Sequence, residues 1–263
     1  MICPKCSYEN EGGNFCIKCG ARLTETASEE ATTSSGTQYA QGQPANGAPN
    51  QYLEGAKNIS KMYFSYFLEV LKRPYASSVK VGGEHFINAI ITIVLYSIII
   101  PLMIFIGLKS LMSGLGIFGL GYSPSFVDVV IKPTFAYIIF LFLVATFTFA
   151  AVRMGLVKAS YKEVISRFGS FLIPFVAILV IALVMSILRI DLFVFVLLLG
   201  FLGTIFLVPP LVIASYKKET RDGIDVVYGS LITYILTFIA LAILGDMLFD
   251  ALKSIFSDVF DLF

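Results

Sequence analysis

Five long runs of apolar residues constrain this chain more than any other feature of its sequence. A membrane-crossing helix needs roughly 20 mostly apolar residues to span about 30 Å of hydrocarbon. The composition agrees with such a solvent, since 57% of the 263 residues are apolar and only 14% are charged. The expected fold class is therefore mainly α, a polytopic helical membrane bundle of about five spans within residues 81–245. The expected spans are approximately 86–108, 134–154, 169–188, 192–214 and 226–245.

Residues 110–131 are apolar as well, but their composition argues against a sixth span. The stretch SLMSGLGIFGLGYSPSFVDVVI contains four glycines, a proline and Asp128. An irregular backbone and a carboxylate are both energetically unfavourable in the hydrocarbon core of a membrane. We therefore expect an interfacial or re-entrant loop here.

The positions of the Lys and Arg side chains predict the orientation. Cytoplasmic segments of membrane proteins are enriched in these residues. With five spans and a cytoplasmic N-terminus, the chain is a multi-pass protein of the cell membrane with its C-terminus outside. The inner set is then Lys57, Lys61, Lys72, Arg73, Lys80, Arg153, Lys158, Lys162, Arg167, Lys217, Lys218 and Arg221, and the outer set is only Lys109, Lys132, Arg189 and Lys253.

All the cysteines lie within the first 20 residues, as two Cys-x-x-Cys pairs. A two-residue gap lets both thiolates of one turn face a single tetrahedral ion, and zinc prefers such soft ligands. Two disulfides, a redox-active dithiol and an iron–sulfur cluster are the alternatives, and a cytoplasmic location disfavours the first. We predict a zinc ribbon over residues 1–23, closed to substrate because the protein supplies the whole ligand set. The metal ligands are Cys3, Cys6, Cys16 and Cys19.

The charge of this ribbon favours a protein partner over nucleic acid. Zinc with four thiolates carries about −2, and the few basic residues of the ribbon are offset by Glu9 and Glu11. A nucleic-acid-binding module would show a basic patch. Residues 24–51 contain no Val, Ile or Leu, so we expect a disordered linker. The ribbon would then act as a tethered docking module for a cytoplasmic protein.

Amphipathic segments flank the spans and imply contact with membrane lipid. Residues 52–80 form an interfacial helix whose regular pattern ends at Arg73-Pro74; it either lies in the lipid interface or packs against the bundle. In residues 246–263, acidic side chains recur at helical spacing on one side and apolar side chains on the other. This pattern predicts an acidic amphipathic helix on the outer surface.

No set of residues in this sequence predicts an active site. His85 is the only histidine and stands beside Glu84, an arrangement that favours a solvated interfacial pair over a catalytic one. The interiors of the spans carry Ser and Thr but no ionisable side chain, which disfavours ion-coupled transport. Pro101, Pro174 and Pro209-Pro210 fall inside spans, where ordinary kinks are expected rather than broken-helix binding sites.

The segment YFSYFLEVLKRPYASSVKVGGEHFINAIITIVLYSIIIPL resembles the entry region of bacterial members of the Yip-domain family. In that family an aromatic-rich amphipathic helix ends in a basic residue and proline and leads into about five spans. Some relatives also carry an N-terminal zinc ribbon and a disordered tether. The resemblance implies a non-enzymatic membrane protein. Eukaryotic relatives engage trafficking GTPases, and some bacterial relatives are associated with ABC-type exporters or with resistance to membrane-active peptides.

We therefore expect a membrane adaptor or assembly factor, acting on an ABC-type exporter or on a membrane-stress and peptide-resistance complex. Two alternatives remain. One is a transporter or permease component that uses the proline-containing spans. The other is a sensor whose segment 246–263 captures cationic peptides.

Overall fold

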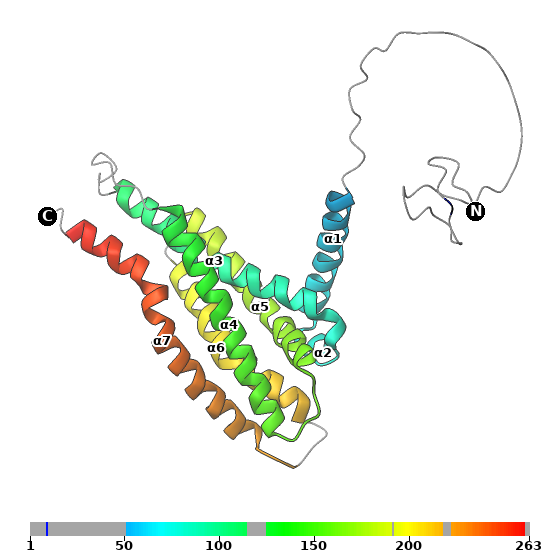
Figure 1. Ribbon diagram of the computed structural model, residues 1–263. Coiled ribbons are helices and arrows are strands. Elements are labelled where there is room, and N and C mark those ends of the chain that lie inside the picture. Colours follow the sequence, from blue (N-terminus) through cyan, green and yellow to red (C-terminus); the bar gives the residue numbers. More distant parts are fainter. Residues whose placement is uncertain (1–8, 10–50, 115–124, 191, 218–221, 261–263) are drawn as a thin grey trace, which may run out of the picture. The chain divides into compact units, whose positions relative to one another are not determined.

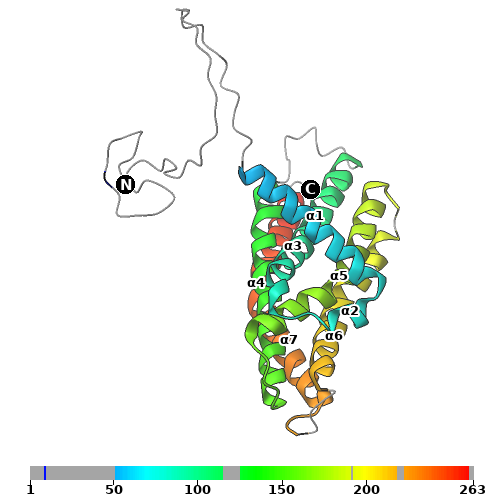
Figure 2. The same cartoon turned by 90° about the vertical axis from the view of Figure 1, so that its right-hand side faces the viewer.

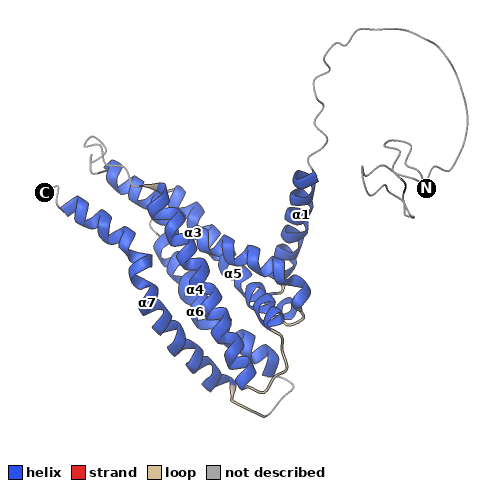
Figure 3. Ribbon diagram, in the orientation of Figure 1, coloured by secondary structure: helices blue, strands red, loops and turns tan. Residues whose placement is uncertain are grey.

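The computed structural model describes residue 9 and residues 51–114, 125–190, 192–217 and 222–260, and nearly all of these are helical (Figure 3). The predicted ribbon 1–23 and linker 24–51 lie outside the described residues, apart from Glu9 and Gln51. The described helices therefore form the membrane part of the chain.

Five helices are long and apolar enough to cross a membrane, which confirms the expected multi-pass, mainly α fold (Figure 1). A 3-10 turn, η1 (Gly83–His85), leads into the first of them, and a π-helical turn, η3 (Val127–Ile131), leads into the second. The spanning helices are α3 (Phe86–Gly114), α4 (Lys132–Met154), α5 (Tyr161–Ile187), α6 (Phe193–Lys217) and α7 (Val226–Phe260).

The two ends of segment 110–131 belong to the neighbouring helices, so the expectation of a loop over the whole stretch is wrong there. Residues 110–114 continue α3, and Val127–Ile131 form η3. An ion pair between Asp128 and Lys132, one helical turn apart, supports the second of these extensions. Residues 115–124 lie outside the described residues. Among the described helices, no sixth one has the length and hydropathy of a span.

Helix α5 packs most extensively against α3 and α6 (Figures 1 and 2). Helix α5 approaches α3 closely at Gly169. A Cβ atom built on Gly169 would lie only 2.4 Å from the Cβ of Ala89 and 2.5 Å from its Cα. Real carbon–carbon contacts are about 3.5–4.0 Å. The two helices therefore cross at a distance that only glycine permits at position 169.

Helix α5 begins well before the expected span 169–188. Ser160 caps it, because the Ser160 side chain accepts a hydrogen bond from the Glu163 backbone N–H at 3.3 Å and the Glu163 carboxylate accepts one from the Ser160 N–H at 2.9 Å. This reciprocal capping box satisfies donors that a helix start leaves free. Lys162 and Arg167, assigned above to a cytoplasmic segment between spans, consequently lie on the first turns of α5.

The prolines do not break the helices that contain them. Pro101, Pro174 and the pair Pro209-Pro210 lie inside uninterrupted α3, α5 and α6. Helix α7 likewise runs on to Phe260. The described part of the predicted helix 246–263 is therefore a continuation of the last span, and residues 261–263 lie outside the description.

The predicted interfacial segment 52–80 forms two helices, α1 (Gln51–Lys72) and α2 (Pro74–Ser78). Helix α1 slants across the side of the bundle (Figure 2) and buries Tyr63, Tyr66 and Val70 in a cluster that includes Ile173 of α5. The Tyr63 hydroxyl also hydrogen-bonds to Thr92 Oγ1 of α3 at 3.0 Å. Of the two interpretations left open by the sequence, packing against the bundle is therefore correct for this face.

Another face of α1 remains exposed and apolar. Phe64, Leu68 and Leu71 follow one another at helical spacing and are all exposed, as are the lysines at positions 61 and 72 beside them. An exposed stripe of apolar and basic side chains is typical of a helix in contact with the lipid interface. Helix α1 thus packs against the bundle on one face and presents a stripe typical of lipid contact on another.

Candidate functional site

The predicted zinc ligands Cys3, Cys6, Cys16 and Cys19 lie outside the described residues. In the part of the chain that the structure describes, no group of three or more His, Cys, Asp or Glu side chains is placed to hold a metal ion. The zinc site therefore stays a prediction from the sequence.

A pocket of about 540 Å³ lies where α1, α2 and η1 meet. Its volume falls within the range of small-molecule sites, about 300–1,000 Å³. The pocket exists because the chain turns at Arg73-Pro74, where proline cannot continue α1, and then turns again at Gly82-Gly83 before α3. Its lining residues are Tyr66, Glu69, Val70, Lys72, Arg73, Ala76, Ser77, Lys80, Val81 and His85.

The buried part of the lining is apolar and aromatic. Tyr66, Val70 and Val81 are buried, and the ring of Tyr66 stacks on His85 with centroids 4.9 Å apart and an interplanar angle of 16°. Burial raises the pKa of the Tyr66 hydroxyl to about 12, so it stays protonated at neutral pH. Tyr66 is therefore a buried, uncharged part of this wall, held by packing.

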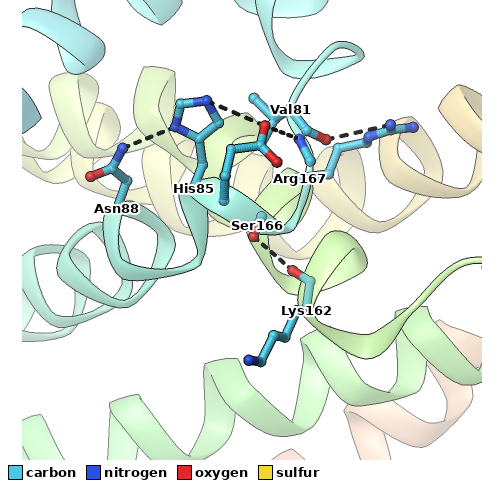
Figure 4. A network of polar contacts seen from close by, with 8 residues as sticks. Val81, His85, Asn88, Lys162, Ser166 and Arg167 are labelled. Carbon is cyan, nitrogen blue, oxygen red and sulfur yellow. Dashed lines mark hydrogen bonds and ion pairs between the residues drawn. The ribbon is translucent and has the colours of Figure 1, made fainter.

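His85 is oriented on its other sides by polar neighbours (Figure 4). Its Nδ1 atom lies 3.2 Å from Asn88 Nδ2, and its Nε2 atom lies 3.6 Å from a carboxylate oxygen of Glu84. Both side chains of the His85–Glu84 pair are partly or largely exposed. The structure thus makes His85 a wall of the pocket. This role could not be predicted from the sequence, because Tyr66 lies 19 positions away in the chain.

The rim of the pocket is basic. Lys72, Arg73 and Lys80 are exposed, and within the described residues none of them forms an ion pair. Glu69 is the one acidic residue of the lining. Three unpaired cations against one carboxylate leave the pocket with a net positive charge, which favours an anionic ligand.

Arg167 stabilises the loop behind the pocket. From the second turn of α5, its Nη1 donates to Ser215 Oγ at 3.1 Å, its Nη2 reaches the Val81 carbonyl oxygen at 3.5 Å, and its Cζ lies 3.8 Å from the centre of the Tyr216 ring. Its Nε is buried and has no hydrogen-bond partner in the described part of the chain. Stacking on an aromatic face together with these hydrogen bonds suits a guanidinium. The side chain ties α6 and the loop before α3 to α5.

Sequence reasoning missed this position, since it treated Arg167 as one of several loop cations. The signal that finds it is Ser160-x-x-Glu163, the capping-box pattern that predicts a helix start. Counting from Tyr161 places Arg167 within the second turn of α5 rather than in solvent.

The comparisons with known proteins identify a relative but no function. No family model matches the chain, so the resemblance to Yip-domain proteins stays a prediction, and no solved structure matches it. The chain is 35% identical over 236 residues to the uncharacterized protein YvbI of Bacillus subtilis strain 168, and the match covers 90% of each chain. This protein belongs to the same family as YvbI.

Proposed function

We propose that this protein is a non-enzymatic membrane adaptor or assembly factor with a cytoplasmic N-terminus. Its bundle would contact a membrane complex, for which an ABC-type exporter or a peptide-resistance complex is the proposed class. The zinc ribbon at residues 1–23 would dock a cytoplasmic protein.

The observation that carries this proposal is how the bundle interior uses its polar groups. The hydroxyls of Thr92, Thr148, Thr204 and Thr233 are buried, and each donates to a carbonyl oxygen of its own helix at 2.8–2.9 Å. Those of Tyr96, Ser97 and Thr237 have no partner among the described residues, but these are uncharged groups. A coupled transporter carries ionisable side chains at mid-membrane. Within the five described spans, the last of which runs from Val226 to Gly245, charged side chains lie only near the ends.

The arrangement of the turns supports the proposed orientation. The turn after α4 touches the turn before α7, because Gly223, at φ +80°, lies so close to Gly155 that a Cβ atom at residue 223 would be 2.7 Å from the Gly155 carbonyl carbon. Arg167 joins the start of α5 to the end of α6. The described basic residues of the proposed inner segments after α3 therefore gather at one end of the bundle, as the positive-inside rule requires. They are Arg153, Lys158, Lys162, Arg167 and Lys217.

Partner recovery tests the proposal. The tagged full-length chain, purified in mild detergent from its own membrane, should carry a stoichiometric membrane-protein partner. A variant with all four cysteines changed to serine should keep that partner and lose the cytoplasmic one. Repeated recovery of the chain without any stoichiometric partner would refute the adaptor role. Flux through the reconstituted chain that survives deletion of residues 1–51 would favour a transporter instead.

A further inference from the structure

The basic pocket between α1, α2 and η1 has a charge, a size and a position that together define a class of ligand. This inference stands apart from the adaptor role, because it rests on the described residues of the pocket alone.

The charge of the rim selects an anion with several acceptor oxygens. Lys72 and Arg73 are consecutive at the end of α1, and Lys80 approaches from the loop after α2, so the cations reach the pocket from two segments. None of them has an ion-pair partner in the described chain. A guanidinium fork beside lysine ammonium groups matches the geometry of a phosphate.

The position of the pocket selects a lipid as the source of that phosphate. The apolar stripe Phe64, Leu68 and Leu71 on α1 ends at Lys72, on the rim. On the other side, α3 begins directly after His85, and its second residue, Ile87, is 63% exposed. The pocket thus lies where exposed apolar side chains meet basic ones. This is the composition found at the boundary between acyl chains and headgroups.

We propose that this pocket binds the phosphate of an anionic phospholipid, with Lys72, Arg73 and Lys80 as the phosphate-binding residues. The stacked Tyr66 and His85 rings form the wall beside the headgroup. The acyl chains lie along the exposed apolar side chains of α1 and α3. Bound lipid would neutralise the three cations and hold the corner between α1 and α2 at the membrane surface.

The test measures lipid retention by the full-length chain. Native mass spectrometry in neutral detergent would compare phosphatidylglycerol with phosphatidylcholine of the same acyl chains. The unchanged chain should retain phosphatidylglycerol preferentially. The triple variant K72Q/R73Q/K80Q should bind it at least tenfold more weakly, since each cation near an anionic surface contributes roughly a fivefold factor.

The matched control is R153Q/K158Q/K162Q, which removes the same charge, one arginine and two lysines, from exposed positions outside the pocket. It should keep most of the affinity. Equal weakening in the two triple variants, or equal retention of the two lipids, would overturn the proposal, because general electrostatics would then explain the binding.

Competition distinguishes a lipid from a soluble phosphate compound. Glycerol 3-phosphate and inorganic phosphate should fail to displace the bound lipid at millimolar concentration. Displacement by either of them would overturn the assignment to a lipid and indicate a soluble phosphate ligand. Because the substituted side chains are exposed, the variants should unfold at the same temperature as the unchanged chain; for a variant that does not, the single change K80Q in the loop replaces the triple change.

Discussion

The crossing of α3 and α5 at Gly169 makes the sharpest prediction about stability. The change G169A adds a Cβ atom that would lie 2.4 Å from the Cβ and 2.5 Å from the Cα of Ala89. Relief to an ordinary carbon–carbon distance requires the helices to separate by about 1 Å or more. Overpacking of this kind costs about 1–3 kcal/mol. The upper end applies here, because a backbone Cα cannot rotate out of the way.

The control for this change is G107A, also within a spanning helix. A Cβ atom at Gly107 meets nothing within 4 Å, so this variant receives only the gain in helix propensity, up to about 1 kcal/mol. The same gain applies to G169A, and the difference between the two variants therefore isolates the overpacking cost. We expect G169A to be less stable than G107A by about 3 kcal/mol.

Unfolding in mixed micelles by titration with sodium dodecyl sulfate, followed by far-ultraviolet circular dichroism, measures this difference without tryptophan, which the chain lacks. The double change A89G/G169A should recover only part of the loss, since the contact with the Ala89 Cα remains. Equal stability of G169A and G107A would refute the close crossing.

Three further predictions concern the ribbon and the pocket. Metal analysis of the full-length chain should find one zinc ion, and serine at any one of the four cysteines should abolish or sharply weaken its binding; a metal-free chain with four free thiols would contradict the ribbon. Burial raises the pKa of Tyr66 to about 12, so the packing of α1 against the bundle is favoured below pH 10 and loses between about 2 and 3 kcal/mol as pH rises through 12. The unfolding temperature of Y66F should fall less steeply over this interval than that of the unchanged chain, and parallel curves would argue against a buried hydroxyl. R167K should lower stability by about 2 kcal/mol, because an ammonium cannot stack on Tyr216 while reaching Ser215 and Val81, and a lysine variant as stable as the original in the same titration would show that these contacts contribute little.

The spans were predictable because their physical requirement is local. Each must be apolar over about 20 consecutive residues, and that property is read from one stretch of sequence without knowledge of its neighbours. The ends were harder to predict. Hydropathy placed the start of α5 at 169, yet Ser160 and Glu163 begin it at Tyr161, since a capping box is a hydrogen-bond pattern to which hydropathy is insensitive.

The pocket was not predictable, because its parts meet only through the packing of distant segments. The sequence contains Lys72 and Arg73 as a basic pair before proline, and it predicts that His85 is a solvated residue near the first span. Nothing in the spacing indicates that the Tyr66 ring stacks on His85. That contact depends on how α1 folds back against α3 and α5, which in turn depends on side chains such as Tyr63 and Ile173.

The same helix crossing fixes both the fold and the pocket. On α5, Arg167 lies two residues before Gly169, and on the α3 side His85 lies four residues before Ala89. The close contact of the two helices at Gly169 is therefore within about one helical turn of both Arg167 and His85. A substitution that separates α3 from α5 at Gly169 should also separate Arg167 from the Val81 carbonyl oxygen. Their contact is already long, at 3.5 Å, so a further separation would break it. Retention of phosphatidylglycerol should consequently fall in G169A although no rim cation is altered, and unchanged retention would show that the loop before α3 holds its conformation without α5.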